Sequence, residues 1–334
     1  MPFSAQTMHS DSPFRLQPGR ISAHRLSRRT LLKGVGGLAA ASVIGGGAVV
    51  AGSAPAQAAL TVAEHEDHGR MQYYKLATSS VGWLPRVNVL LPDGYDTSRR
   101  YPVLFLLHGG GENYSTFDTK YDIRNHTAGR DLIVVMPDGG KAGWYCDPES
   151  SNVGPRNWET FHVDELIPWV DATFSTIAQP AGRAVSGFSM GGFGALKYAA
   201  KHPELFGSVS CHSGPADLRI QDGAVVHWAN FTAGATDLKG GTIYGIPWDQ
   251  ARVSADNLVE HVESYRGKRI FLVCGTDSDR YESIVLPSQR SFEKALDGAG
   301  IGYERYEDTG AHIVRWGRIQ QDIDSMLNFL TKAG

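Results

Sequence analysis

Short, uninterrupted apolar runs are the clearest pattern in the chain, and each run ends in glycine, proline or a small polar residue. Residues 103–107 read V-L-F-L-L and lead into H-G-G-G, while residues 132–136 read L-I-V-V-M and lead into P-D-G-G. Runs of this length between turn residues are typical of strands buried on both faces of a parallel sheet. Further strands are predicted at residues 71–78, 86–91, 183–186, 208–211, 270–274 and 303–306.

Segments with helical spacing of apolar residues separate these runs. They predict helices at residues 158–174, 191–202, 286–298 and 316–330, with Pro287 in the first turn of the third helix. Residues 213–266 show little periodicity, and we expect them to form an insertion over the sheet. Strands that alternate with helices in this way predict an α/β fold with a mostly parallel central sheet and helices on both faces.

The first 58 residues have the composition of a targeting signal. Residues 27–33 read S-R-R-T-L-L-K, residues 34–52 carry no charge, and A-Q-A at residues 56–58 offers a cleavage site. A membrane anchor is the alternative, but seven of those nineteen uncharged residues are glycine, which makes a poor span. We therefore expect residues 1–58 to be a twin-arginine signal peptide. Residues 59–334 are then one secreted or extracytoplasmic domain with no stable membrane span.

Charge and cysteine content exclude several classes of protein. The 334 residues carry a formal net charge of −3, yet residues 1–58 hold six Lys/Arg and one acid, so the remainder is clearly acidic. An acidic body of this size offers no electrostatic surface for nucleic acid. Three cysteines are too few for a disulfide scaffold.

Candidate cofactor motifs are equally weak. The chain has no H-E-x-x-H, and no G-x-G-x-x-G follows its first strand. The run of His65, Glu66, Asp67 and His68 lies where we expect the flexible start of the mature chain. No metal site and no cofactor are therefore expected.

A serine stands at the junction of a predicted strand and a predicted helix. Gly187-Phe188-Ser189-Met190-Gly191 fits G-x-S-x-G, and the small residues on either side permit the tight turn that exposes the serine hydroxyl. The helix that begins beyond Ser189 adds positive potential where an oxyanion would form. A turn of small residues without chemistry is the alternative, but the flanking strand and helix favour a nucleophile.

The histidine that activates such a serine is expected after the last strand, because the usual order along the chain is serine, acid, histidine. His312 follows the strand predicted at residues 303–306 and precedes the final helix. His212 also follows a strand but comes too early for that order. His312 is therefore the predicted general base.

The ends of other predicted strands supply the remaining groups. An acid is expected after the strand at residues 270–274, where spacing alone does not choose among three carboxylates: Asp277, Asp279 and Glu282. Two backbone N–H donors are needed to stabilise an oxyanion. One is expected from Met190, the residue after the nucleophile, and the other from Gly110 in the H-G-G-G loop.

Taken together, these motifs resemble the esterase D and antigen 85 (mycolyltransferase) branch of the α/β-hydrolases. The resemblance spans residues 73–330, and its most specific parts are N-W-E-T-F at residues 157–161, E-L-I-P at residues 165–168 and the serine elbow. It implies an α/β-hydrolase fold. It also implies that Glu282, ten residues before a phenylalanine of the next helix, is the acid. In plain esterases of the family the acid lies earlier in this loop, which would favour Asp277 or Asp279.

Two departures from the family pattern favour hydrolysis over transfer to trehalose. In the mycolyltransferases the sequence of the oxyanion loop resembles D-G-L-R. This chain has H-G-G-G at residues 108–111 instead, without the acid or the arginine. An aromatic residue often stands two positions after the family's histidine, where this chain has Val314.

The residues and the resemblance together predict an exported serine esterase that hydrolyses carboxylic esters through an acyl-enzyme intermediate. Its expected substrate is a small-molecule or glycan-linked ester. An acyltransferase with a sugar or glycerol acceptor is the main alternative, and a non-catalytic exported binding protein with the same fold is the second. The sequence leaves open the acyl chain, the alcohol and the oligomeric state.

Overall fold

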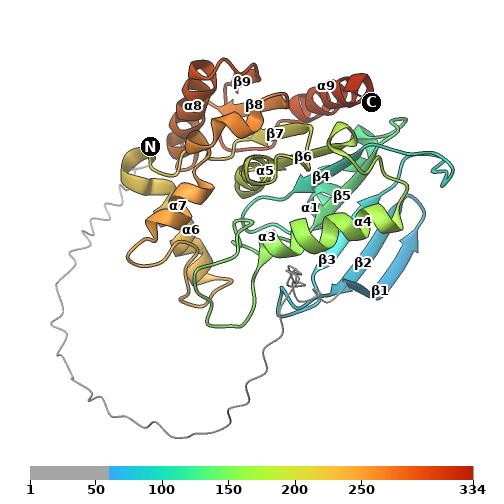
Figure 1. The fold of residues 1–334 in the computed structure, drawn as a ribbon, viewed down its shortest axis with the longest axis horizontal. Coiled ribbons are helices and arrows are strands. Elements are labelled where there is room, and N and C mark those ends of the chain that lie inside the picture. Colours follow the sequence, from blue (N-terminus) through green and yellow to red (C-terminus); the bar gives the residue numbers. More distant parts are fainter. Residues whose placement is uncertain (1–59, 334) are drawn as a thin grey trace, which may run out of the picture. The chain divides into compact units, whose positions relative to one another are not determined.

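A nine-stranded sheet organises the part of the chain that the computed structural model describes, residues 60–333 (Figure 1). Its strands are β1 (Thr61–His68), β2 (Met71–Ala77), β3 (Arg86–Leu90), β4 (Val103–Leu107), β5 (Ile133–Pro137), β6 (Arg183–Phe188), β7 (Ser208–His212), β8 (Arg269–Gly275) and β9 (Glu304–Asp308). The spatial order is β1-β2-β3-β5-β4-β6-β7-β8-β9. Pairing is antiparallel from β1 to β5 and parallel from β5 to β9. The C-terminal ends of the parallel strands therefore share one edge, where the loops of a site can meet.

Helices cover both faces of this sheet. Those that pack on it are α1 (Thr116–Thr119), α2 (Ile123–His126), α3 (Trp158–Thr160), α4 (Ile167–Thr173), α5 (Met190–Lys201), α8 (Glu282–Gly298) and α9 (Trp316–Ala333). One hydrophobic core lies under α3, α4, α5 and α8, and the other lies under α1, α2 and α9. The fold class predicted from the sequence is confirmed.

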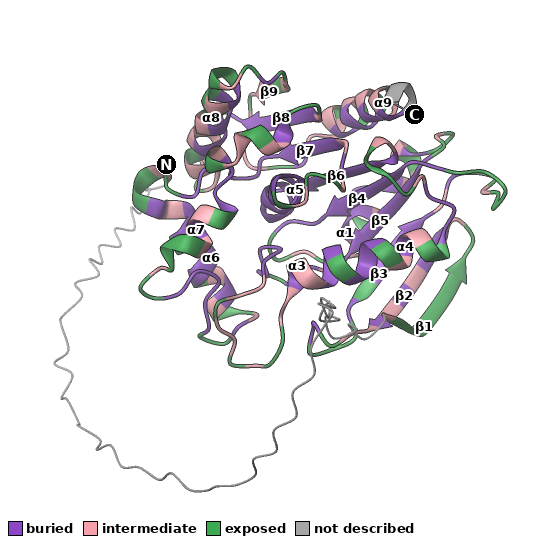
Figure 2. Cartoon of the chain, in the orientation of Figure 1, coloured by how far each residue is buried: buried purple, intermediate pink, exposed green. Residues whose placement is uncertain are grey.

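Residues of the central strands alternate between these two cores. Phe105 of β4 enters the core beneath α5, whereas its neighbours Leu104 and Leu106 enter the core beneath α9. Because both faces are covered, every residue of β4, β5 and β6 is buried, which explains the unbroken apolar runs of β4 and β5 (Figure 2). β1 is exposed along its whole length.

The first strand was not predicted. Residues 65–68 were expected to be a flexible start of the mature chain, but they belong to β1, which pairs antiparallel with β2. β1 is an edge strand made almost entirely of polar residues, so the period-two apolar pattern that reveals a strand is missing. The predicted signal peptide at residues 1–58 lies outside the described residues.

A proline lies at each of two differences between the predicted and observed helices. The helix predicted at residues 158–174 contains a π-helical turn, Phe161–Leu166, between α3 and α4, and Pro168, which has no N–H to donate, follows that turn. The helix predicted to start at residue 286 with Pro287 in its first turn starts instead at Glu282. Because Pro287 has no N–H, it cannot donate to the Ser283 carbonyl one turn earlier. That carbonyl accepts a hydrogen bond from Gln221 Nε2 at 3.0 Å instead.

The segment predicted as an insertion, residues 213–266, contains α6 (Ile220–Ala235), α7 (Gln250–Asp256) and two 3₁₀ turns, Leu258–Glu260 and Val262–Tyr265. α6 contacts α8, and α7 contacts α5. The segment thus packs largely on the helices of one face, and Ser213 at its start also donates its N–H to the Val273 carbonyl of β8 at 2.7 Å. None of the helices in residues 60–333 has both the length and the apolar character needed to cross a bilayer.

A buried charge network joins α9 to the centre of the sheet. The Asp322 carboxylate accepts hydrogen bonds from Arg269 Nη1 at 2.7 Å, Ser210 Oγ at 2.6 Å and His212 Nε2 at 2.9 Å. Burial raises the pKa of Asp322, but the charge of Arg269 and the His212 hydrogen bond outweigh burial and lower that pKa from 3.8 to about 2. The charged form of Asp322 therefore stabilises the fold.

We expect this network to make stability pH-dependent. Because the pKa of Asp322 is lower in the folded than in the unfolded chain, its contribution is present above about pH 4 and is lost as the pH falls towards 2. The size of this contribution is about 2 kcal/mol. Urea unfolding across a pH series should show the loss in the wild type and a flatter curve in Asp322→Asn. Parallel curves for the two proteins would contradict this account.

Candidate functional site

Ser189 occupies a strained turn between β6 and α5. Its φ of 57° and ψ of −118° lie outside the conformations common for residues with a side chain. The turn is possible because its neighbours are glycines: a Cβ on Gly191 would lie 2.1 Å from the Leu107 carbonyl oxygen, and one on Gly187 would lie 2.3 Å from the Gly191 backbone. The Ser189 N–H donates to the His212 carbonyl at 2.8 Å, which ties the turn to β7.

The structure brings Ser189, His312 and Glu282 together. His312 Nε2 lies 2.8 Å from Ser189 Oγ, and His312 Nδ1 lies 3.3 Å from Glu282 Oε1. The rings of Phe188 and Tyr281 flank the imidazole, with centroids 5.0 and 5.1 Å from its own. The serine can pass its proton to an imidazole held in place by a carboxylate and two aromatic rings.

Glu282 is almost fully buried and is fully hydrogen-bonded. Besides His312, it accepts hydrogen bonds from Ser213 Oγ at 2.7 Å, the Gly275 N–H at 3.2 Å and Cys274 Sγ at 2.9 Å. Burial raises the pKa of Glu282, but the hydrogen bonds from His312, Cys274 and Ser213 outweigh burial and lower the pKa below its ordinary value. Glu282 is therefore charged at neutral pH and can stabilise an imidazolium.

The two aspartates that competed with Glu282 contact the backbone of the same loop. Asp279 accepts the N–H of His312 at 2.7 Å and the N–H groups of Tyr281 and Glu282 at 2.7 and 2.9 Å. Asp277 accepts the N–H of Gly310 at 3.2 Å. Asp279 thus joins the start of α8 to the histidine loop, whereas only Glu282 among the three bonds the imidazole.

The H-G-G-G loop after β4 is held in shape by its surroundings. His108 Nε2 accepts the Gly139 N–H at 3.0 Å, so Nδ1 carries the proton and donates to the Gly109 carbonyl at 2.9 Å. The Gly111 N–H donates to the Lys141 carbonyl at 2.7 Å. Gly110, between these anchored residues, lines the same cleft as Ser189 and Met190. The predicted donors Gly110 and Met190 thus lie in one cleft with the serine.

That cleft has a volume of about 550 Å³ and two kinds of wall. Its apolar side includes Trp144 and Trp228, whose rings pack edge to face with centroids 5.0 Å apart. Its polar side includes Glu112, Lys120 and Lys141. Trp228 comes from α6, so the insertion that showed no clear pattern in the sequence contributes directly to the site.

An acid, Glu112, supports the H-G-G-G loop from just beyond the motif. Its carboxylate accepts the Gly109 N–H at 3.0 Å, the Tyr121 hydroxyl at 2.8 Å and Lys120 Nζ at 3.2 Å. Both carboxylate oxygens are therefore occupied by groups that shape the loop. The acid stands one residue beyond the motif, where a comparison of the four loop residues alone could not find it.

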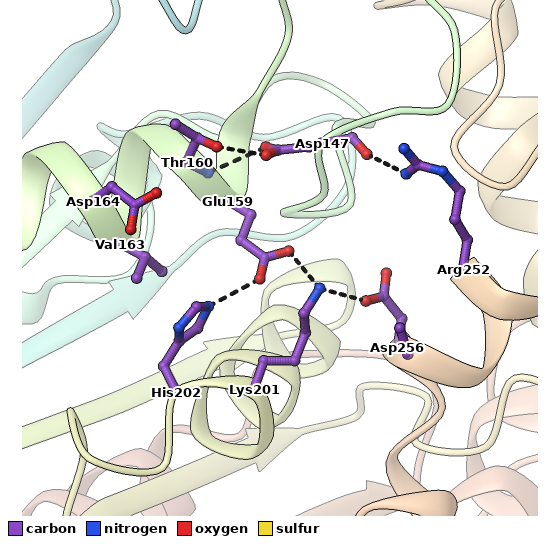
Figure 3. Close-up of a pocket in the computed structure, with 10 residues that line it drawn as sticks. Asp147, Glu159, Thr160, Val163, Asp164, Lys201, His202, Arg252 and Asp256 are labelled. Atoms are coloured by element: carbon purple, nitrogen blue, oxygen red, sulfur yellow. Dashed lines mark hydrogen bonds and ion pairs between the residues drawn. The ribbon is translucent and has the colours of Figure 1, made fainter. Parts of the chain in front are cut away.

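A second, polar pocket of about 300 Å³ shares no lining residue with this cleft (Figure 3). Glu159 accepts hydrogen bonds from His202 and Lys201, both at 3.0 Å, and lies 2.8 Å from the fully buried Lys197. Lys201 also bonds Asp256 at 3.0 Å. Burial raises the pKa of Glu159, but Lys197 and His202 outweigh burial and hold that pKa well below its usual range. These charges satisfy one another and anchor α5 to α3 and α7.

Sequence reasoning missed Ser213 and Arg315, which support the candidate site. Ser213 bonds Glu282, and Arg315 donates to the carbonyls of Gly310 and Ala311 at 3.2 and 2.8 Å, which steadies the loop that carries His312. Neither residue belongs to a recognisable motif. Their roles depend on contacts between segments that are far apart in the sequence.

The fold described above is that of the α/β-hydrolases. Residues 78–330 match the protein family described as "Putative esterase". Esterase Rv1288 of Mycobacterium tuberculosis H37Rv is 55% identical over 283 residues, which cover 81% of this chain and 62% of that protein. The chain thus spans less than two thirds of the length of this relative.

Two further proteins extend the comparison. Diacylglycerol acyltransferase/mycolyltransferase Ag85B of Mycobacterium leprae is 28% identical over 222 residues, which cover 60% of this chain and 66% of that protein. The solved S-formylglutathione hydrolase of Agrobacterium tumefaciens has the same fold, with a TM-score of 0.64 at 19% identity, over 81% of this chain and 99% of that one. The chain belongs to this esterase family, in its esterase D and antigen 85 branch, as its motifs predicted.

The geometry separates the roles of the two best acid candidates. Glu282→Gln should lower kcat/KM for an ester by about a thousandfold or more, because the amide no longer stabilises the imidazolium. Asp279→Asn is the matched control: it keeps one oxygen for the N–H groups of Tyr281 and Glu282, loses the acceptor of the His312 N–H, and should cost at most about tenfold. Steady-state hydrolysis of p-nitrophenyl acetate measures both. A larger loss in Asp279→Asn than in Glu282→Gln would move the acid to position 279.

Proposed function

We propose that this protein is a serine esterase that hydrolyses carboxylic esters in two steps. Ser189 is the nucleophile, His312 the general base and Glu282 the acid that orients and stabilises the histidine. His312 takes the hydroxyl proton as Ser189 Oγ attacks the ester carbonyl. The alcohol then leaves with a proton from His312, and a water activated by the same imidazole releases the acid from the acyl-enzyme.

The observation that carries this proposal is the hydrogen-bonded line from Ser189 Oγ through His312 to Glu282, with contacts of 2.8 and 3.3 Å. A non-catalytic binding protein with the same fold has no need of a strained serine turn, of an imidazole packed against two aromatic rings, or of a buried carboxylate. Each of these features is costly to maintain and useful for acyl transfer.

The oxyanion donors in this mechanism are the N–H groups of Gly110 and Met190. Met190 is the first residue of α5, so its N–H lies at a helix N-terminus, where the helix dipole adds positive potential. Each such donor is worth roughly 3 kcal/mol of transition-state stabilisation. Hydrogen bonds to Glu112 and to the Lys141 carbonyl, together with the bond from His108 to the Gly109 carbonyl within the loop, fix the conformation of the H-G-G-G loop before the ester binds.

Hydrolysis is the proposed outcome rather than transfer to a sugar. A transferase holds its acceptor with polar side chains so that an alcohol, not water, reaches the acyl carbon. In this cleft the acid nearest the oxyanion loop, Glu112, is engaged by Gly109, Tyr121 and Lys120. Three of the roughly four acceptor positions of its carboxylate are thus used to hold the loop, which leaves little capacity to orient an acceptor hydroxyl.

The proposed place of action is outside the cytoplasm. This part of the proposal rests on S-R-R-T-L-L-K at residues 27–33 and on the uncharged stretch that follows it. The twin-arginine route carries folded proteins, and a domain whose cysteines are all free has no need of oxidative folding after export.

The nucleophile and the base can be tested directly. Ser189→Ala and His312→Ala should each lower kcat for p-nitrophenyl acetate by at least about a thousandfold, since the triad acts as a unit. Unchanged near-ultraviolet circular dichroism would show that the fold is intact. Substantial activity in either purified variant would overturn the assignment.

The balance between water and alcohol is a separate measurement. With a p-nitrophenyl ester as donor and excess trehalose or glucose, we expect the free acid to be the main product, and short to medium acyl chains to react faster than long ones. The reason is the absence of a free acceptor-binding acid at the oxyanion loop. Chromatography of the products decides: acylated sugar as the main product would establish the transferase.

A further inference from the structure

A pocket of about 260 Å³ on the N-terminal strands has a feature that the proposed chemistry does not use. Asn88, in the middle of β3, lines this pocket and is completely buried. Within the described residues, neither its amide nitrogen nor its amide oxygen has a hydrogen-bond partner. A buried amide that gains nothing from the fold is destabilising, so a polar group there calls for an explanation.

Strand pairing builds the pocket around this amide. Glu66, Tyr73 and Asn88 are aligned across β1, β2 and β3, and Glu64, Lys75 and Arg86 form the next aligned row. Residues aligned across neighbouring strands point to the same face, so the two rows form one surface. The β1 strand, which looked like a polar tail in the sequence, is thus one wall of the pocket.

Aromatic side chains border the same surface. The guanidinium of Arg86 lies 5.5 Å from the centre of the Tyr114 ring and donates to the Tyr114 hydroxyl at 2.6 Å. Tyr73 donates to Asp118 at 3.2 Å and accepts from Arg124 at 3.0 Å, which holds its ring in place. The pocket therefore combines fixed aromatic rings with an amide and two carboxylates.

The charges in the pocket favour a neutral ligand. Glu64 pairs with Lys75, Glu66 lies 3.3 Å from His68, and Arg86 is engaged by Tyr114. With two acids against two bases, neither an anion nor a cation has an electrostatic advantage. A hydroxyl group both donates and accepts, as the amide of Asn88 does, and aromatic rings pack against the C–H face of a sugar. These groups together match a neutral saccharide.

One loop connects this pocket to the candidate active site. Gly110 and Glu112 line the cleft of Ser189, and Tyr114, four residues beyond Gly110, lines the pocket. Four residues span at most about 14 Å from Cα to Cα. We propose that the pocket binds a neutral saccharide and holds the sugar part of a glycan-linked ester. The link to an ester rests on the proposed function, whereas saccharide binding itself does not.

Binding can be measured without turnover in full-length Ser189→Ala protein. Saturation-transfer difference NMR with xylotriose, cellotriose and trehalose should show saturable binding of at least one of these sugars. Asn88→Leu and Tyr114→Ala should each weaken that binding by about tenfold or more. Tyr303→Ala, a half-buried tyrosine outside both pockets, is the matched control and should bind as Ser189→Ala does.

A thermal melt separates a binding role of Asn88 from a structural one. Asn88→Leu removes an unsatisfied amide, so its Tm should rise while sugar binding falls. Failure of all three sugars to bind, or binding that survives both Asn88→Leu and Tyr114→Ala, would overturn the inference. Because binding is read in Ser189→Ala protein, that result is independent of whether the wild type hydrolyses esters.

Discussion

The backbone of Ser189 is the constraint on which the rest of the candidate site depends. Its positive φ turns the chain sharply from β6 into α5, and the turn fits only because Gly187 and Gly191 have no side chains. Strain of this kind persists only where the surrounding packing enforces it. Here β4 and β7 enclose β6 on both sides, and the hydrogen bond from Ser189 to the His212 carbonyl ties the turn to β7.

The same packing places the other groups of the site. Because β4 to β9 are parallel, the loops after β4, β6, β8 and β9 emerge at one edge of the sheet, although they are spread over some two hundred residues. Asp279 then joins two of these loops by bonding the backbone of both Glu282 and His312. A carboxylate that contacts only N–H groups can thus position a base without touching it.

Buried charge supports this arrangement from both faces of the sheet. On one face Lys197 and Lys201 bind Glu159 of α3 and Asp256 of α7, and so hold α5, the helix that begins immediately after Ser189, against both. On the other face Asp322 joins α9 to Ser210 and His212 of β7, the strand that holds the serine turn. Removing one partner from a buried pair of this kind leaves an uncompensated charge and is costly, so these pairs favour one arrangement of the helices.

The sequence by itself determined the elements with strong local signals. Apolar runs bounded by glycine and proline identified β4 and β5, and G-x-S-x-G with its flanking strand and helix identified Ser189. The order of residues along the chain identified His312. These signals are local because burial on both faces, a tight turn and a helix start each impose a pattern on a few neighbouring residues.

The choice of Glu282 over two aspartates came from family resemblance, and only the structure shows which carboxylate reaches the imidazole. β1 escaped detection because an exposed edge strand needs no apolar face, and its partner is identified only by pairing. Trp228, Ser213 and the unsatisfied amide of Asn88 gain their meaning from segments distant in sequence. Tertiary structure alone decides such contacts, because side-chain hydrogen bonding and burial depend on what the whole fold brings into reach.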